Sequence, residues 1–578
     1  MKTKLTTLLA LGLGVAFVAV VAMSCSKPTP APTAAPKLSA TSQANLPPGV
    51  FGPAVDATTQ ITQADLTTTT PLIPSDLYRT NNAIDHAQAA KFAWLEFIAL
   101  VSPNKPSPTR GVPGGSFSSV KGGSNSTYPL VWETYQHRSE LFPSNGSGGV
   151  TAPQPWDQAP KYVYSPQPTY PSGVETLFNN LDEASQIFQN NLFYPVNATP
   201  YEVLFEAKVN QLENQYVTNN YPLPNPLPSP LAENATTLYD GNIEIKAAWR
   251  PVSSIDPAQL YRYHVADVIT YSGTMNNPVA KNEKYALIGL HIIHKTKNYP
   301  SFIYATFEQV DDYVNQVTNQ PTGVYYQTLY TQDGPPPNPP QGYQLGSYYF
   351  ATDPAGFSAD GTQPTASSFT ATANPTRVFD INNPLAWPNG TQYTAPNGKG
   401  FDPVPLVSTD GKQIQVTLPP TGNADVANIN AQVRSLMSSL GNDFVWQYYQ
   451  LTGVQAIPTS DETTKDYYLA NIVVESSQAG IQLFRGGLSQ NPSFEPVPNI
   501  RNKLNVIDKV GGGSQKYSMG GCMGCHGAAQ GEGGDFSFLL STGQAGFNVD
   551  LVQDNPVETL KNATARRALI HSNSSFKY

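Results

Sequence analysis

Hydrophobic residues recur at helical spacing over residues 85–101 and predict the first substantial helix of the chain. The recurring side chains are Phe92, Leu95, Ile98 and Ala99. They lie three or four positions apart, so they would share one face of a helix, and Pro103 ends the pattern. Weaker patterns predict short helices over residues 173–190 and 466–478.

The longest amphipathic pattern covers residues 426–451. Its apolar stripe consists of Val426, Ile429, Val433, Leu436, Met437, Leu440, Phe444, Tyr448 and Leu451. Such a stripe predicts a helix that buries one face, with Met437 in the core. Gly441 lies inside the pattern and is a point where the helix can divide in two.

Alternating or continuous apolar residues predict strands between residues 201 and 310. In residues 201–210 one face would carry Val203, Phe205, Ala207 and Val209. The next segments, spaced as in an antiparallel meander, are residues 242–249, 261–270, 285–296 and 302–310. Residues 535–540 predict one more strand. The expected fold class is α+β, with a β-rich, multi-layer antiparallel body and several packed helices.

The N-terminus has the pattern of an export signal. Lys2 and Lys4 precede an apolar run over residues 5–21, and Ala22-Met23-Ser24-Cys25 resembles a lipoprotein processing site. Met23 departs from the usual motif, so an ordinary cleaved signal peptide and an uncleaved anchor helix remain alternatives. We expect lipidation at Cys25 and an outer-membrane lipoprotein that faces the periplasm or the cell surface.

These patterns divide the chain into five segments. Residues 1–25 are the expected signal peptide, and residues 26–75 form a tether rich in Pro, Ala and Thr. Residues 76–332 would form the β-rich body with its N-terminal helix. Residues 333–425 are rich in loops, and residues 426–578 combine a helical region with a C-terminal segment that contains a Cys-x-x-Cys-His motif.

Composition agrees with an exported protein rich in strands and loops. Charged residues make up only 13% of the chain, which contains 53 prolines, 44 glycines and 31 tyrosines. The formal net charge of −9 argues against nucleic acid as a partner.

A Cys-x-x-Cys-His motif, Cys522-Met523-Gly524-Cys525-His526, is the most specific feature of the sequence. This spacing is typical of covalent attachment of one haem c. Two cysteines three positions apart can each bind one vinyl group of a porphyrin, and the following histidine can ligate the iron. A zinc knuckle would need two further ligands at zinc spacing, and a thioredoxin-like pair would not account for His526.

The second axial ligand of such a haem is not evident from the motif. No methionine follows His526, so the usual methionine ligand of a small cytochrome c domain is missing. We therefore expect the haem to dock against the upstream body. His291 and His294 are candidate distal ligands from an apolar strand, and their opposite parity places them on opposite faces. An open or water-bound iron remains an alternative, as do Met275 and Met437.

Several segments resemble a group of large exported bacterial proteins described as cytochrome c family proteins. The resembling pieces are residues 92–100, 131–135, 245–250, 289–296, 306–310, 522–527 and 535–538. The resemblance implies export and a covalent haem, without an assigned reaction. The C-terminal motif with its acidic-aromatic tail is also similar to lysine-cross-linked cytochromes that oxidise hydroxylamine, over about twenty residues.

Three functions are compatible with these observations. The first is an electron carrier of the cell envelope with a redox protein as partner. The second is a haem enzyme with an open iron that acts on a small molecule, such as peroxide or a reduced nitrogen species. The third is a surface-binding protein in which the haem is structural or sensory.

Overall fold

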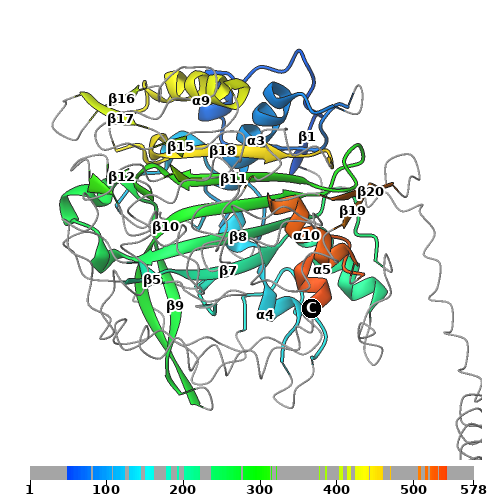
Figure 1. Cartoon of the computed structure of the whole chain (residues 1–578). Coiled ribbons are helices and arrows are strands. Elements are labelled where there is room, and N and C mark those ends of the chain that lie inside the picture. Colours follow the sequence, from blue (N-terminus) through cyan, green and yellow to red (C-terminus); the bar gives the residue numbers. More distant parts are fainter. Residues whose placement is uncertain are drawn as a thin grey trace, which may run out of the picture. The chain divides into compact units, whose positions relative to one another are not determined.

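A sheet of eight strands, antiparallel apart from one short pairing, forms the centre of the described structure (Figure 1). Together with its helices it gives the α+β class expected from the sequence. In this computed structural model the described residues are 49–79, 83–106, 109–123, 129–144, 150–161, 177–183, 192–193, 201–221, 236–274, 277–312, 314–315, 320–321, 376–377, 385–386, 403–407, 413–417, 424–441, 443–459, 469, 505–508, 515–518, 521–531 and 533–542.

Six strands lie in the order β18-β11-β10-β8-β7-β3, while β9 pairs with the first half of β10 and β4 pairs with β9. The bounds of the eight strands are β3 Gln136–His137, β4 Asn179–Asn180, β7 Leu204–Val209, β8 Ile243–Pro251, β9 Val265–Thr274, β10 Asn277–His294, β11 Ile303–Gln309 and β18 Tyr449–Gln455.

The strands predicted between residues 201 and 310 are present, but their order in the sheet is not that of a meander. The cause is the length of strand β10. Its first half pairs with β9 as a hairpin, and its second half pairs with β8, with a register shift between Leu287 and Gly289. Residues 257–262 form a 3-10 helix, so β9 begins only at Val265. Strand β8 therefore lies between β10 and β7, where a meander would place β9 between β8 and β10.

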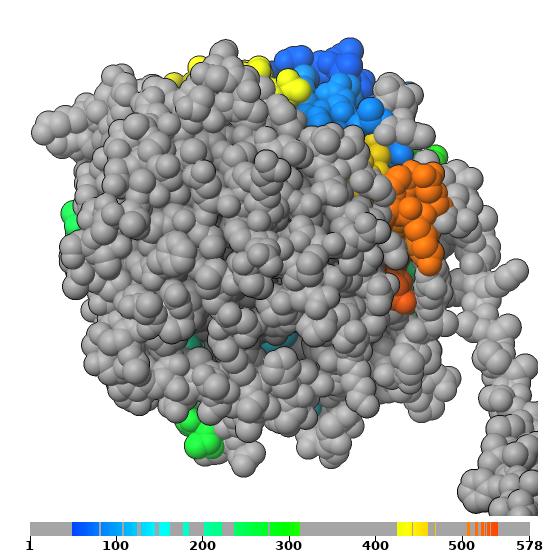
Figure 2. All heavy atoms as spheres, viewed as in Figure 1, coloured from blue at the N-terminus to red at the C-terminus, as the bar shows by residue number. Residues whose placement is uncertain are grey.

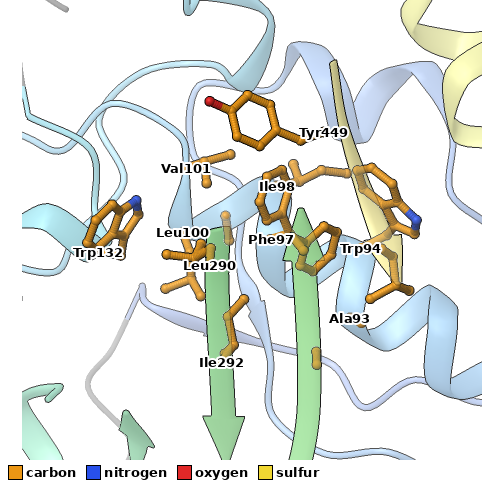
Figure 3. Close-up of a cluster of buried hydrophobic side chains, with 14 of the residues drawn as sticks. Ala93, Trp94, Phe97, Ile98, Leu100, Val101, Trp132, Leu290, Ile292 and Tyr449 are labelled. Atoms are coloured by element: carbon orange, nitrogen blue, oxygen red, sulfur yellow. The ribbon is translucent and has the colours of Figure 1, made fainter. Parts of the chain in front are cut away.

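Helix α3 (His86–Leu100) covers one face of the sheet, as its pattern predicted. Asp85 caps the helix by accepting a hydrogen bond of 3.0 Å from the backbone of Gln88. Figure 3 shows its apolar side chains beside Leu290 and Ile292 of β10. The ring of Phe97 stacks on Phe307 of β11 at a centroid distance of 4.0 Å. This packing forms the larger hydrophobic core.

Helix α9 (Ala424–Met437) is shorter than the pattern over residues 426–451 predicts. Gly441 has a φ of 95°, which is unfavourable for residues with a side chain, and the chain changes direction there. The later apolar positions belong to a 3-10 helix at Val445–Tyr448 and to β18. Met437 is buried in the core, as expected.

Helices α5 (Gln211–Asn220), α10 (Gly521–Gly531) and α11 (Phe538–Thr542) pack on the opposite face of the sheet. Their smaller apolar cluster joins Tyr216, Val217, Cys522, Met523, Leu539 and Leu540 to Val209, Ile293 and Tyr304 of the strands. Figure 1 shows α5 and α10 near one another at this face. The C-terminal motif therefore docks against the upstream body.

Two predicted elements are wrong. Residues 535–540 form a turn and the start of α11 instead of a strand, because Asp535 and Phe536 both have positive φ. The described part of the helix predicted over residues 173–190 contains strand β4, which pairs in parallel with β9. The predicted helix over residues 466–478, apart from Leu469, and the signal and tether as far as residue 48 lie outside the described residues.

The remaining described elements are short: β1 Phe51–Gly52, α2 Gln63–Thr67, β2 Ile73–Pro74, α4 Arg138–Leu141, β5 Leu192–Phe193, β6 Tyr201–Glu202, β12 Val314–Asn315, β13 Gln320–Pro321, β14 Thr376–Arg377, β15 Leu385–Ala386, β16 Pro403–Val407, β17 Gln413–Thr417, β19 Asn505–Asp508 and β20 Gln515–Ser518. Within the described ranges, no helix is both long enough and apolar enough to cross a lipid bilayer.

Candidate functional site

The Cys-x-x-Cys-His motif lies on helix α10. Positions 525 and 526 follow position 522 by three and four residues, so both lie on the same side of the helix as position 522. The first turn is anchored from outside the helix. The backbone N–H of Cys522 donates to Leu469 O at 2.8 Å, and that of Met523 donates to Gln455 Oε1 at 2.7 Å. The thiol of Cys522 is buried and donates to Leu469 O at 3.1 Å.

His526 is held in one orientation by the chain that follows α10. Its Nδ1 lies 2.7 Å from Phe536 O. A carbonyl can only accept, so Nδ1 carries the proton and Nε2 keeps a free lone pair. Metal-bound histidines are commonly oriented by such a second hydrogen bond. Loss of water around the ring lowers the pKa of His526 to about 4, although the bond to Phe536 opposes this shift.

The turn that presents Phe536 O is strained and buried. Among the described residues, the non-glycine residues with positive φ are Phe302, Asp535 and Phe536, and all three lie in this region. Such conformations are unfavourable and persist where surrounding contacts hold them. Here Asp535 Oδ2 accepts from Lys295 Nζ at 2.6 Å and from the backbone of Leu238 at 2.8 Å.

His291 of β10 faces α10. Its ring centroid lies 5.9 Å from that of His526, at an angle of 33° between the rings. The residue is 4% exposed, and neither ring nitrogen has a hydrogen-bond partner among the described residues. Burial, followed by the proximity of His526, holds the pKa of His291 well below its usual value. An unpaired buried imidazole is unfavourable unless another group binds it.

His294 lies on the other face of the sheet. Its Nδ1 is 2.7 Å from Glu96 Oε1 of α3, and its ring contacts Phe92 at a centroid distance of 5.4 Å. The predicted opposite orientation of the two histidines is thereby confirmed. The structure brings His291 towards His526 and ties His294 to a carboxylate in the larger core.

Aromatic side chains occupy the space around His526. The ring centroids of Tyr304 and Phe538 lie 5.3 Å and 4.9 Å from that of His526. No haem-shaped site is evident among the described residues, so a porphyrin would displace some of these rings. The ligand chemistry nevertheless fits haem c, because the motif shares one helix side and the free Nε2 of His526 is defined. Figure 2 shows the C-terminal described segment, in orange, reaching the surface, and His526 is partly exposed.

Of the remaining sequence candidates, one lies in the other core and the rest fall outside the described residues. Met437 belongs to the opposite core, while Cys25 and Met275 lie outside the described ranges, as does the side chain of Cys525. In the described part of the chain, no three His, Cys, Asp or Glu side chains meet as a metal cluster. Sequence reasoning missed Phe536 O, Lys295 and Asp535, because a left-handed turn with no glycine leaves no pattern.

Comparisons with known proteins provide no relative. No family model matches the chain, and neither the search of curated proteins nor that of solved structures finds a match.

Proposed function

We propose that this protein is an exported monohaem c-type cytochrome that carries electrons at the cell envelope. Cys522 and Cys525 would hold the haem, His526 would be the proximal iron ligand, and His291 the distal ligand. The haem would supply one-electron oxidation and reduction of its iron. The observation that carries the proposal is the buried His291, which faces the motif histidine and has no hydrogen-bond partner within the described ranges.

The ligand orientation supports the proximal role of His526. Phe536 O fixes the proton on Nδ1, which leaves Nε2 as the only nitrogen able to bind a metal in the neutral ring. A hydrogen-bonded imidazole is also a stronger donor to iron. The buried pair of Lys295 and Asp535 keeps the carbonyl in place.

His291 supports an electron carrier over an enzyme with an open iron. A strong ligand on the distal side would keep a small molecule from the iron. The strand that carries His291 is paired on both sides, with β8 and β11, so its position is well defined. A rigid ligand set reduces the structural change that accompanies electron transfer.

The expected location rests on the N-terminus. Cys25 would carry the lipid, and the segment up to about residue 48 would connect it to the body, since Val55, Leu66 and Ile73 already belong to the larger core. Covalent haem attachment outside the cytoplasm agrees with this location. A redox protein of the envelope would be the partner, without nucleic acid.

The experiment is expression with the haem-attachment machinery, followed by mass measurement of the mature chain and haem staining after denaturation. We expect one covalently bound haem, lost in Cys522→Ala/Cys525→Ala. Cys25→Ala is the matched control, because it removes a cysteine outside the motif and should abolish the lipid while keeping the haem. A wild-type chain without bound haem would contradict the proposal.

A further inference from the structure

Two buried glutamates meet beside the turn that follows α10. Glu213 lies in the first turn of α5, and Glu244 lies in β8 opposite Val209 of β7. Their carboxyl groups lie close enough together for each to shift the pKa of the other. Ser537 Oγ is 3.5 Å from Glu213 Oε1 and also interacts with Glu244. The amide of Asn242, which directly precedes β8, lies near Glu213.

No basic side chain neutralises this pair. Glu213 is 0% exposed and Glu244 is 7% exposed, yet neither forms an ion pair with Lys, Arg or His among the described residues. Several other buried carboxylates face a basic group: Glu96–His294, Glu133–His264, Glu140–Arg110, Asp182–Arg138, Glu183–Lys246, Asp311–Arg262 and Asp535–Lys295. An unpaired buried carboxylate is strongly unfavourable, so the pair requires a cation or a shared proton.

Unsatisfied polar atoms surround the same point. Glu213 Oε2, Glu244 Oε1 and both amide atoms of Asn242 are buried without a hydrogen-bond partner in the described part of the chain. Asn242 is 0% exposed and lies next to a carboxylate that it does not bind at hydrogen-bond geometry. Buried amides normally have partners, so this amide indicates a bound group between the side chains.

We propose that Glu213, Glu244, Asn242 and Ser537 bind one calcium ion. All four side chains offer oxygen, which hard divalent cations prefer, and the cluster contains no sulfur or imidazole. Two carboxylates, each able to bind through both oxygens, with an amide and a hydroxyl oxygen provide up to six ligands, within the range that calcium takes. Magnesium fits less well, because it keeps several waters and the ligands are buried.

The ion would join three parts of the chain that are distant in sequence. Glu213 comes from α5, Asn242 and Glu244 from the start of β8, and Ser537 from the turn before α11. Ser537 directly follows Phe536, whose carbonyl orients His526. Calcium would therefore stabilise the turn that positions the motif histidine. The inference rests on the four side chains and does not depend on bound haem.

The test is calcium binding by the mature full-length chain after removal of metals with a chelator. Equilibrium dialysis with radioactive calcium should show one ion per chain, and calcium should raise the melting temperature. Binding at pH 6 should release protons, because the carboxyl groups must ionise. Glu213→Gln and Asn242→Ala should each weaken binding at least tenfold, whereas Glu283→Gln, on the exposed β9–β10 hairpin, should leave it unchanged.

Absence of calcium binding to the wild-type chain at millimolar concentration would overturn the inference, whatever the variants do. Equal binding in wild type and in Glu213→Gln would overturn it as well, since the ion would then lie elsewhere. If calcium does not bind and Glu213→Gln stabilises the chain at neutral pH, the carboxyl groups share a proton. Repeating the dialysis on Cys522→Ala/Cys525→Ala separates this result from the haem proposal.

Discussion

At the scale of single residues, two histidines three positions apart have opposite roles. His294 Nδ1 lies 2.7 Å from the Glu96 carboxylate of α3, so its imidazole already has a charged neighbour within the larger core. His291 lies on the other face and has no partner among the described residues, although its ring faces that of His526. The alternation of side chains along a strand was enough to predict that the two histidines lie on opposite faces of the sheet. Only the packed structure shows which of these faces contacts the helix that carries the motif.

Replacing His291 with Ala should open the distal position of the haem. We expect the reduced protein to become high-spin and to bind carbon monoxide, because no other described histidine lies opposite His526. His294→Ala is the matched control: it should keep the wild-type spectrum and lower the free energy of unfolding by about 3 kcal/mol, since Glu96 would lose its partner. Optical spectra and urea unfolding measure the two effects. The reverse pattern would assign the ligand to His294.

The ion pair of Lys295 with Asp535 can be tested in the same way. Lys295→Met should lower the free energy of unfolding by about 3–5 kcal/mol, because it leaves the Asp535 carboxylate buried and unpaired. The double variant Lys295→Met/Asp535→Asn should recover part of this loss, as it removes the buried charge. Urea unfolding compares the two proteins. Equal losses in the single and double variants would show that the pair does not stabilise the turn.

At the scale of elements, the sequence patterns predicted regular helices well and irregular turns poorly. Helix α3 has a repeating apolar stripe and a capping Asp85, and it was predicted within one residue at each end. The pattern over residues 426–451 continued beyond Gly441 because the strand that follows is also apolar. The α10–α11 turn was missed for a different reason: Asp535 and Phe536 adopt positive φ only because tertiary contacts hold them.

The neighbouring carboxyl groups of Glu213 in α5 and Glu244 in β8 predict how the free energy of unfolding of the metal-free chain depends on pH. Burial raises the pKa of Glu244 to about 7, with Asp535 nearby adding to the shift, while Lys295 is occupied by Asp535. The folded pKa therefore exceeds the ordinary value of 4.5, and the folded state binds more protons than the unfolded state between these values. Stability should fall as pH rises across this range, by up to about 1.4 kcal/mol per pH unit for one proton.

This slope is measured by urea unfolding between pH 4.5 and 8 with a chelator present. The relevant quantity is the difference in unfolding free energy between wild type and Glu244→Gln, because this difference isolates the contribution of one carboxyl group. That difference should shrink when the experiment is repeated with calcium. A difference that does not vary with pH would contradict the role of this carboxyl group.

At the scale of the whole molecule, the β-rich body and the docking of the motif against it followed from the sequence. The order of the strands did not, because β10 is long enough to pair with β9 and then with β8, and spacing along the chain contains no signal for that choice. The sheet separates two environments: a large apolar core around α3 and a smaller cluster around α10. The candidate site belongs to the second, between a central strand and a C-terminal helix.

The most direct test of the account is an optical spectrum of the purified protein in the oxidised state, the reduced state, and the reduced state with carbon monoxide. A covalent haem bound by His526 and His291 predicts low-spin haem c bands that do not change with carbon monoxide. A high-spin spectrum that shifts with carbon monoxide would contradict the distal role of His291 and favour a haem enzyme or sensor. A protein without haem absorbance, after expression with the attachment machinery, would contradict the proposed function altogether.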